Sequence, residues 1–283
     1  MDERRIGVIG AGTMGNGIAQ ISALAGYDVT MIDVDDAALQ RGRDALQSSL
    51  ARMVKKGTLA QAEADAALGR VQGSTDMQQL RGAHLLIEAA TERTELKLRI
   101  LRQLDELADD DAVIATNTSS ISITQLAAVL RRPQRFIGVH FFNPVPLMAL
   151  VELIRGLQTD DATHAAARRF VERVGKTAVD VRNSPGFVVN RLLVPMINEA
   201  IFVLQEGVAS AADIDAAMKL GCNHPIGPLA LADMIGLDTV LAVMQVFYEG
   251  FNDPKYRPAP LLKEMVDAGR VGRKSCQGFH RYD

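Results

Sequence analysis

The chain has 283 residues, of which 48% are hydrophobic and 23% are charged, and its formal net charge at pH 7 is −3. This length fits one large domain or two ordinary domains with a sizeable core. The nearly balanced charge excludes the basic footprint typical of proteins that bind nucleic acid or a membrane surface, so we expect neither partner.

The cysteine and histidine content narrows the class of protein further. Cys222 and Cys276, the two cysteines, stand far apart, which excludes a disulfide framework and suits a reducing compartment. The five histidines are scattered without ligand spacing, so no metal site is expected. There is no signal-like segment before the first strand, and no uncharged run approaches the roughly 20 residues of a membrane helix. We expect a cytoplasmic protein.

A glycine-rich loop follows the first predicted strand and precedes a helical pattern. In its G-x-G-x-x-G spacing, Gly10 allows a tight turn, Gly12 lets the backbone approach a pyrophosphate, and Gly15 lets helix and strand pack closely. The second strand ends at Asp33, where a carboxylate can hold an adenosine ribose and repel the 2′-phosphate of NADP. The pattern predicts NAD binding, the alternative being a ligand-free glycine turn in a flavodoxin-like fold. Arg41 lies too far into the next helix to argue for NADP.

Residues 36–68 have helical periodicity with a break at Gly57 and Thr58, which predicts two antiparallel helices inserted after the second strand. Arg52 and Lys56 lie four positions apart on the first of these helices and therefore share one face. A solvated basic face is the usual explanation of such a pair.

Strands and helices then alternate. Strands are predicted over 85–90, 111–115, 135–139, 150–154 and 177–181, and helices over 92–107 and 160–174. This order predicts an α/β fold with a Rossmann-like, doubly wound and mainly parallel sheet. Ligands bind such sheets outside the carboxyl ends of the strands. Because the glycine loop, Asp33, Glu92, residues 117–120 and His140 follow strand ends, we expect them to gather at one edge.

The α/β pattern breaks at residues 183–186, so the predicted domains are 1–183, which binds NAD, and 184–283, which is all-α. Pro195 is expected to kink the first helix of the second domain unless it lies near the start of that helix. Helices are predicted over 188–206, 211–220, 228–250 and 259–268, and a loop over 272–279.

His140 and Glu152 form a candidate catalytic pair. A turn through Pro144 and Pro146 would place their two strands side by side. An imidazole can take a proton at neutral pH, and a carboxylate behind it fixes its tautomer and stabilises the imidazolium. Oxidation of an alcohol needs such a base while hydride leaves for a nicotinamide. A His and a Glu at strand ends are more often structural, but the nearby cofactor loop favours catalysis.

Three further polar residues are candidates for the site. Ser119 can hydrogen-bond a reacting oxygen, although Ser119 and Asn117 equally suit a turn or a helix cap. Asn190 stands at the start of the second domain, where a capping or surface role is the alternative. No G-x-S-x-G elbow surrounds Ser119, so a hydrolytic arrangement is not expected.

Several motifs occur together, and their combination is more specific than any one of them. They are GVIGAGTMG (7–15), IEA (87–89), NTSS (117–120), GVHFFNP (138–144), VE (151–152), SPGFVVNR (184–191) and GPL (227–229) with Asp233. Over essentially its whole length the chain resembles the L-3-hydroxyacyl-CoA dehydrogenases, particularly the short bacterial members that act on 3-hydroxybutyryl-CoA.

The resemblance implies reversible oxidation of (S)-3-hydroxyacyl-CoA to 3-oxoacyl-CoA with NAD. His140 would be the catalytic base paired with Glu152, and Ser119 and Asn190 would bind the substrate oxygen or the base. Arg52 and Lys56 would bind the phosphates of coenzyme A. The helical domain would form a homodimer and cover the substrate. Cofactor binding would fall to Gly10, Gly12, Thr13, Met14, Gly15, Asp33, Glu92, Lys97, Asn117 and Asn143.

The chain departs from the family pattern at three places. Arg52 and His224 stand where many members have Lys, and residues 275–279 read SCQGF where the family often has SGxGF, which bears on the tail loop. Two alternatives stay open: a dehydrogenase of free hydroxy or sugar acids on the same scaffold, and a non-catalytic, crystallin-like relative. The sequence does not set the acyl chain length.

Overall fold

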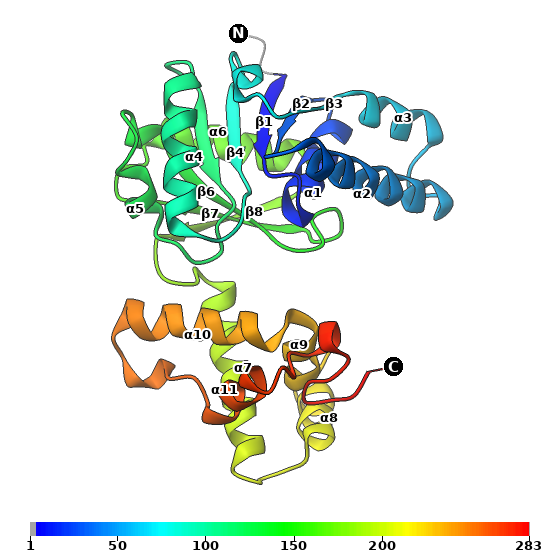
Figure 1. Cartoon of the computed structure of the whole chain (residues 1–283), viewed down its shortest axis with the longest axis vertical. Helices are drawn as coiled ribbons and strands as arrows, with labels where there is room; N and C mark the ends of the chain where they lie inside the picture. The colour runs from blue at the N-terminus through cyan, green and yellow to red at the C-terminus, as the bar shows by residue number, and fades with distance from the viewer. Residues whose placement is uncertain (1–3, 283) are drawn as a thin grey trace. The chain divides into compact units, whose positions relative to one another are not determined.

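The computed structural model describes residues 4–282, and the chain divides between Ser184 and Pro185 into two compact units (Figure 1). The first unit carries the sheet and the second is helical. The division lies one residue beyond the boundary drawn from the sequence.

The first unit is built on an eight-stranded sheet in the order β3-β2-β1-β4-β5-β6-β7-β8. All neighbours pair in parallel except β6 and β7, which are antiparallel, so the prediction of a mainly parallel, doubly wound sheet is confirmed. The strands are β1 (Arg5–Ile9), β2 (Asp28–Ile32), β3 (Val71–Ser74), β4 (Leu85–Glu88), β5 (Val113–Thr116), β6 (Phe136–Phe141), β7 (Leu150–Arg155) and β8 (Thr177–Arg182).

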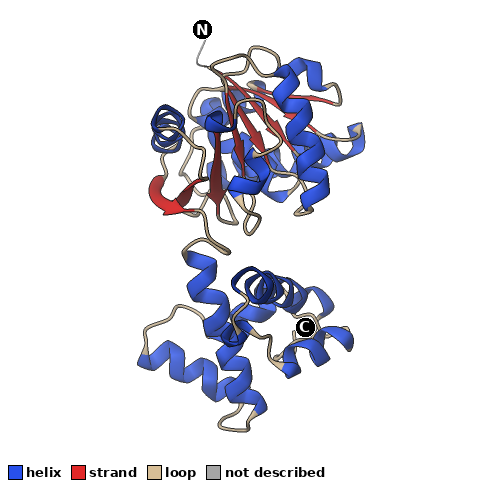
Figure 2. Ribbon diagram, turned by 90° about the vertical axis from the view of Figure 1, so that its left-hand side faces the viewer, coloured by secondary structure: helices blue, strands red, loops and turns tan. Residues whose placement is uncertain are grey.

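Helices cover both faces of this sheet (Figure 2). They include α1 (Thr13–Leu24), α4 (Thr94–Leu107), α5 (Ile123–Ala127) and α6 (Asp161–Arg173). On one face, Val139 belongs to the same buried cluster as Ile18 of α1 and Phe170 of α6. On the other face, Gly138 packs toward Ile123 of α5. The alternation of side chains along β6 therefore sends successive residues into two cores.

The predicted helical pair is present as α2 (Asp36–Lys55) and α3 (Gln61–Gly69). The side chain of Asp35 accepts a hydrogen bond from Ala38 N at 2.7 Å and caps α2. The chain then returns to the sheet edge through β3 and the short 3₁₀ helix η1 (Met77–Leu80), two elements that the sequence did not predict. Thr75, which follows β3, and Met77 of η1 line the candidate site.

The second unit holds α7 (Val189–Gln205), α8 (Ala211–Gly221), α9 (Pro228–Ile235), α10 (Leu237–Phe251) and α11 (Pro260–Asp267). The prediction of one helix over 228–250 is wrong, because α9 and α10 meet at 97°. Gly236 makes this bend with φ +101°, a conformation that other residues rarely adopt. α7 continues through Pro195 as one helix. Within residues 4–282, no single helix is long and apolar enough to cross a membrane, although α9 and α10 pass that test as a bent pair.

Candidate active site

The glycine loop joins β1 to α1 with the geometry expected from its spacing. Gly10 has φ +102°, and a Cβ atom there would lie 2.7 Å from the carbonyl oxygen of Ala89. A Cβ atom on Gly15 would overlap the carbonyl of Gly10, so this glycine lets α1 pack against the loop. A Cβ atom on Gly12 would meet nothing within 4 Å. The first turn of α1 therefore faces open space, which suits a phosphate group at a helix N-terminus.

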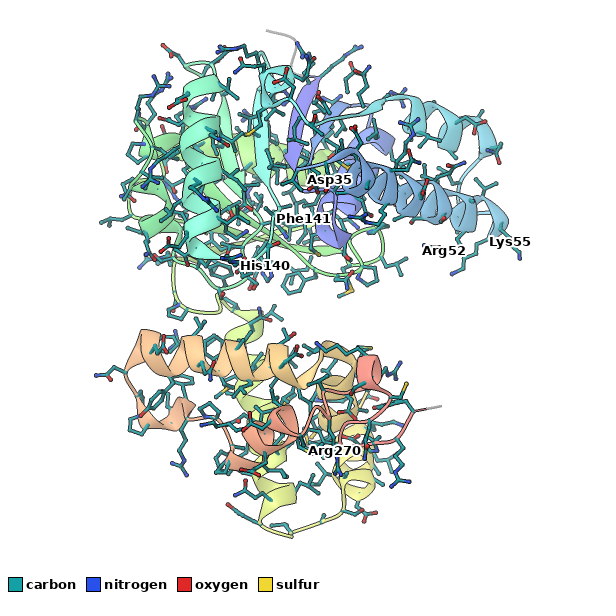
Figure 3. The ribbon with its side chains drawn as sticks, viewed as in Figure 1. Asp35, Arg52, Lys55, His140, Phe141 and Arg270 are labelled. Carbon is teal, nitrogen blue, oxygen red and sulfur yellow. The ribbon has the colours of Figure 1, made fainter. Side chains whose placement is uncertain are left out.

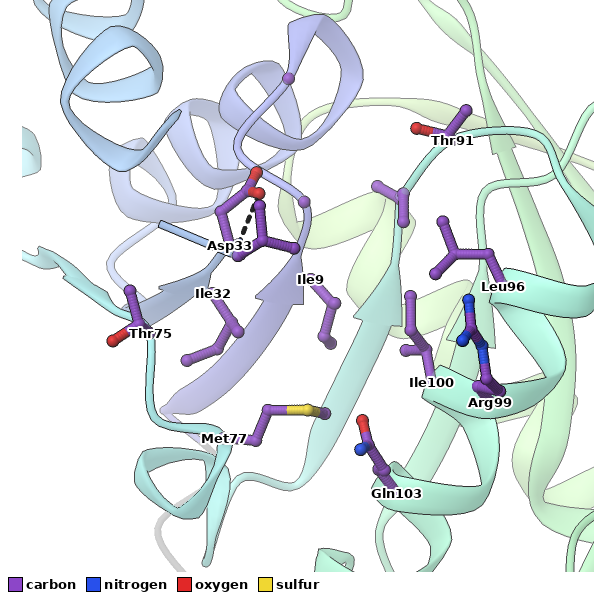
Figure 4. A pocket seen from close by; sticks show the side chains of 15 residues that line it. Ile9, Ile32, Asp33, Thr75, Met77, Thr91, Leu96, Arg99, Ile100 and Gln103 are labelled. Atoms are coloured by element: carbon purple, nitrogen blue, oxygen red, sulfur yellow. Dashed lines mark hydrogen bonds between the residues drawn. The ribbon is translucent and has the colours of Figure 1, made fainter. Parts of the chain in front are cut away.

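Asp33 ties the end of β2 to this loop. Its Oδ2 accepts a hydrogen bond from Ala11 N at 2.6 Å, and its Oδ1 accepts one from Val34 N at 2.7 Å. The carboxylate is half-buried at the mouth of a cavity of about 630 Å³ (Figure 4). Ile32, Met77 and Ile100 supply apolar walls. An apolar slot beside a carboxylate fits an adenosine, so these residues fit a dinucleotide.

The position of Arg41 differs from the expectation that it lies too far along its helix to reach the cofactor. Arg41 lines a second cavity of about 420 Å³ together with Gly12 and Asp33. Its position along α2 therefore does not remove it from the cofactor loop, contrary to the reasoning from sequence distance. Asp33 remains the residue that disfavours a 2′-phosphate, because like charges at short range repel.

His140 and Glu152 face each other across the antiparallel pair β6 and β7. They occupy directly opposite positions of the register, and His140 Nδ1 lies 2.8 Å from Glu152 Oε2. Both side chains are buried, with 6% and 1% of their surface exposed. The predicted pairing of their strands is confirmed, but His140 lies within β6 rather than after it. The peptide bond between Asn143 and Pro144, in the turn that joins the strands, is cis.

Asn117 connects the end of β5 to the strand that carries His140. Its backbone N–H donates to the carbonyl of Glu88 at 2.7 Å, and its Oδ1 accepts from Phe141 N at 2.9 Å. This bond fixes the buried Asn117 beside the last residues of β6.

Glu92 accepts several hydrogen bonds from the turn that follows Asn117. Its Oε1 accepts hydrogen bonds from Thr118 Oγ1 at 2.5 Å, Ser119 N at 2.9 Å and Ser119 Oγ at 3.2 Å. The N–H and hydroxyl of Ser120 donate to the same oxygen. Partial burial raises the pKa of Glu92, but the charge of Lys97 and the hydrogen bonds from Thr118 and Ser119 outweigh it, so the pKa lies below its usual value. Glu92 precedes α4, which begins two residues later than predicted.

Lys97 lies inside the protein rather than at an open surface. Its side chain is 1% exposed, and Nζ lies 2.8 Å from Glu88 Oε1, 3.0 Å from Glu88 Oε2 and 3.3 Å from Glu92 Oε2. Nζ also donates to the carbonyl of Ala90 at 3.1 Å. The ammonium group is thus enclosed by two carboxylates. The sequence assigned a role to Lys97 but none to Glu88, the buried carboxylate that holds it, or to Thr116, whose hydroxyl donates to Glu88.

The remaining predicted residues lie on other segments of the chain. Arg52 is exposed at the end of α2, and Figure 3 shows it with Lys55 away from His140. Lys56 is exposed just beyond the last residue of α2, and Asn143 is exposed after β6. Asn190 is the second residue of α7, in the second unit. Their roles stay predictions.

A mainly parallel sheet with this glycine loop, followed by a helical unit, defines a dinucleotide-binding protein of the two-domain dehydrogenase class. Residues 5–184 match the family model described as 3-hydroxyacyl-CoA dehydrogenase, NAD binding domain, and residues 186–282 match the C-terminal domain of the same family. The chain therefore belongs to the 3-hydroxyacyl-CoA dehydrogenase family and is an NAD-dependent oxidoreductase.

Relatives match over almost the full length. The chain is 52% identical over 279 residues to a 3-hydroxybutyryl-CoA dehydrogenase of Bradyrhizobium diazoefficiens, covering 99% of this chain and 95% of the relative. It is 48% identical over 283 residues to a probable 3-hydroxybutyryl-CoA dehydrogenase of Bacillus subtilis, covering 100% and 99%. The crystal structure of (S)-3-hydroxybutyryl-CoA dehydrogenase from Ralstonia eutropha is similar with a TM-score of 0.97 at 59% identity, covering 100% of both chains.

Proposed function

We propose that this dehydrogenase interconverts (S)-3-hydroxybutyryl-CoA and acetoacetyl-CoA, with His140 as general base and acid. The observation that carries the proposal is the buried contact of 2.8 Å between His140 Nδ1 and Glu152 Oε2 at the carboxyl end of β6. The short acyl chain is supported by the names of the relatives that are 52% and 59% identical.

The chemistry follows from this geometry. Because Nδ1 binds Glu152, the substrate hydroxyl proton would be taken at Nε2 of His140. Glu152 holds the imidazole in that tautomer and stabilises the imidazolium that forms. Bound NAD would supply the acceptor for the hydride of the alcohol carbon, and NADH would supply the hydride in the reverse direction. Ser119 and Asn190 would hydrogen-bond the substrate oxygen, where negative charge develops, or the base His140.

The cofactor would lie along the strand ends of the first unit. The backbone N–H groups at Gly12, Thr13 and Met14 would hold the pyrophosphate, and Asp33 the adenosine ribose. Glu92, Asn117 and Asn143 would bind the nicotinamide side. The supporting observations are the open space at Gly12 and the cavity beside Asp33.

Turnover of acetoacetyl-CoA with NADH, followed by loss of nicotinamide absorbance, tests the proposal. The wild-type protein should reduce acetoacetyl-CoA, and His140→Ala should lower kcat by about 10²- to 10⁴-fold, as loss of a general acid or base does. Binding of NADH should survive this substitution. A wild-type protein that binds NADH but does not reduce acetoacetyl-CoA would support the crystallin-like alternative. Unchanged turnover in His140→Ala would remove His140 from the mechanism.

Substitutions at the basic end of α2 test whether the substrate is an acyl-CoA or a free acid. Arg52→Ala with Lys56→Ala should raise KM for acetoacetyl-CoA roughly tenfold, because phosphate contacts are charge-assisted, and should change KM for acetoacetate little. The matched control is Lys263→Ala, an exposed Lys on α11. Equal effects on both substrates, or faster reduction of the free acid by the wild-type protein, would favour the free-acid alternative.

A further inference from the structure

Glu88, the last residue of β4, is a fully buried carboxylate that accepts hydrogen bonds from a loop, a helix and a strand. Its Oε1 accepts from Ala90 N at 2.7 Å and Lys97 Nζ at 2.8 Å, and its Oε2 accepts from Thr116 Oγ1 at 2.6 Å. Glu88 and Thr116 are 0% exposed and Lys97 is 1% exposed. The carboxylate therefore joins the end of β4, helix α4 and the end of β5 at one point.

A buried ion pair needs a reason other than stability. Removing two charges from water costs several kcal/mol per ion, and well-packed apolar residues in the same place are often equally stable. Buried charges that persist can instead fix one arrangement of neighbouring groups. The groups fixed here are those at the carboxyl edge of the sheet, beside the cofactor loop.

The contacts continue from Glu88 to the proposed site. Lys97 Nζ, held by both oxygens of Glu88, lies 3.3 Å from Glu92 Oε2. The other oxygen of Glu92 accepts from Thr118 Oγ1, Ser119 N and Ser119 Oγ. Each side chain in the series therefore restrains the next, from the buried Glu88 to the half-buried Ser119.

We propose that Glu88 is a positioning residue for the dehydrogenase reaction. Through Lys97 it holds the carboxylate of Glu92, and through Glu92 it orders the Ser119 turn before cofactor and substrate bind. The inference rests on the proposed function, which places Glu92 beside the nicotinamide ribose and Ser119 beside the substrate. The competing explanation is that Glu88 only stabilises the packing of α4 against β4. Under that explanation, Glu88→Gln lowers the stability of the protein without changing its affinity for the cofactor.

The test is direct binding of NADH to Glu88→Gln, measured by nicotinamide fluorescence, with the folded fraction measured by circular dichroism. The substitution keeps the size of the side chain but removes the charge that holds Lys97. We expect Kd for NADH to rise about tenfold, the equivalent of one charge-assisted hydrogen bond. KM for NADH should rise in the same proportion, while kcat changes less. An unchanged Kd in folded Glu88→Gln would overturn the inference.

Asp105→Asn is the matched control on the same helix. Asp105 is 7% exposed and accepts hydrogen bonds from the backbone and side chain of Arg131, at the end of α4 away from Glu92. The Asp105→Asn variant also loses a carboxylate charge beside a cation, so it should lower the stability of the protein and leave Kd for NADH unchanged. A rise in Kd as large as that of Glu88→Gln would show a general effect of charge loss on α4 and would overturn the inference.

The double variant Glu88→Gln with Lys97→Met keeps the test decisive if Glu88→Gln does not fold. It removes both buried charges together and leaves neither unpaired. It should bind NADH about tenfold more weakly than the wild type, because Glu92 loses its Lys97 partner. A folded double variant with wild-type Kd would overturn the inference. Since NADH binding is measured without substrate, failure of acetoacetyl-CoA reduction would count against the proposed function alone.

Discussion

At the scale of single residues, Glu92 joins the turn that carries Ser119 to Lys97 on α4. One carboxylate oxygen collects the Thr118, Ser119 and Ser120 donors, and the other faces Lys97 at 3.3 Å. The side chain keeps 38% of its surface exposed, so it stays accessible to a ligand. The geometry therefore couples the orientation of Ser119 to the ionised state of Glu92.

The lowered pKa of Glu92 predicts how stability depends on pH. Partial burial opposes ionisation, but Lys97 and the Thr118 hydrogen bond favour it more strongly, so the folded protein binds this proton less tightly than the unfolded chain. The contribution of Glu92 is complete above its ordinary pKa of 4.5 and is lost as pH falls below that value toward the lower folded pKa.

Urea unfolding of wild type and Glu92→Gln as a function of pH checks this sign. The wild type should be more stable by a constant margin from pH 5.5 to 7, and the margin should shrink as pH falls below about 4.5. Glu95→Gln, at an exposed carboxylate in the first turn of α4, is the control and should change stability little. A margin that grows toward acid would contradict the lowered pKa.

The sequence could predict some contacts of the site and not others, depending on how far apart the partners lie. His140 and Glu152 are joined by a short turn, so adjacent strands bring them together. Lys97 lies on an amphipathic helix, where Lys is ordinarily a surface residue. Its partner Glu88 belongs to an apolar strand, and only the packing of α4 against β4 brings these charges together.

At the scale of elements, the strands and helices that were not predicted from the sequence are those with weak local patterns. β3 reads VQGS, with two of its four residues exposed at the sheet edge, and α5 has five residues, too few for a helical period. The bend between α9 and α10 depends on Gly236. It was not predicted because the apolar pattern continues through this residue. Long elements such as α2 and α6 were predicted because their periodicity runs over several turns.

Asp233 holds the C-terminal segment against α9. It is 1% exposed, its Oδ1 accepts from Phe279 N at 2.9 Å, and its Oδ2 accepts from His280 N and Tyr282 Oη, each at 2.9 Å. Gly278 approaches the same carboxylate so closely that a Cβ atom there would overlap it. The tail, predicted as a loop, contains the short 3₁₀ helix η4 (Arg273–Ser275), and its last residues are held by one buried acid, even though its sequence departs from the family pattern at Cys276.

Asp233→Asn should destabilise the protein by about 1–3 kcal/mol, because an amide NH₂ replaces one acceptor and leaves a buried backbone N–H without a partner. Tyr282→Phe, which removes one hydrogen bond and leaves the carboxylate intact, should cost only about 1 kcal/mol. Urea unfolding followed by circular dichroism measures both values. Equal losses, or a neutral Asp233→Asn, would mean that the tail does not depend on this acceptor.

At the scale of the whole molecule, the helical unit exposes large apolar side chains on three of its helices. Leu192 on α7 is 70% exposed, Leu220 on α8 is 87% exposed and Met234 on α9 is 52% exposed. A large contiguous apolar patch marks a protein interface, whereas scattered exposed apolar side chains are common on any surface. We propose, from the family resemblance, that the helical unit forms a homodimer and that these side chains lie in its interface.

Sedimentation equilibrium should give a mass twice the chain mass of 30.6 kDa. A charge placed in the interface must be buried without a partner, so Leu192→Glu, Leu220→Glu or Met234→Glu should weaken dimerisation about tenfold or more where that side chain lies in the contact. Leu157→Glu, at a residue that is 87% exposed on the first unit, should leave the mass unchanged. A wild-type mass equal to that of one chain would contradict the proposal of a homodimer. Dimers that withstand all three helical substitutions but dissociate with Leu157→Glu would move the interface to the NAD-binding unit.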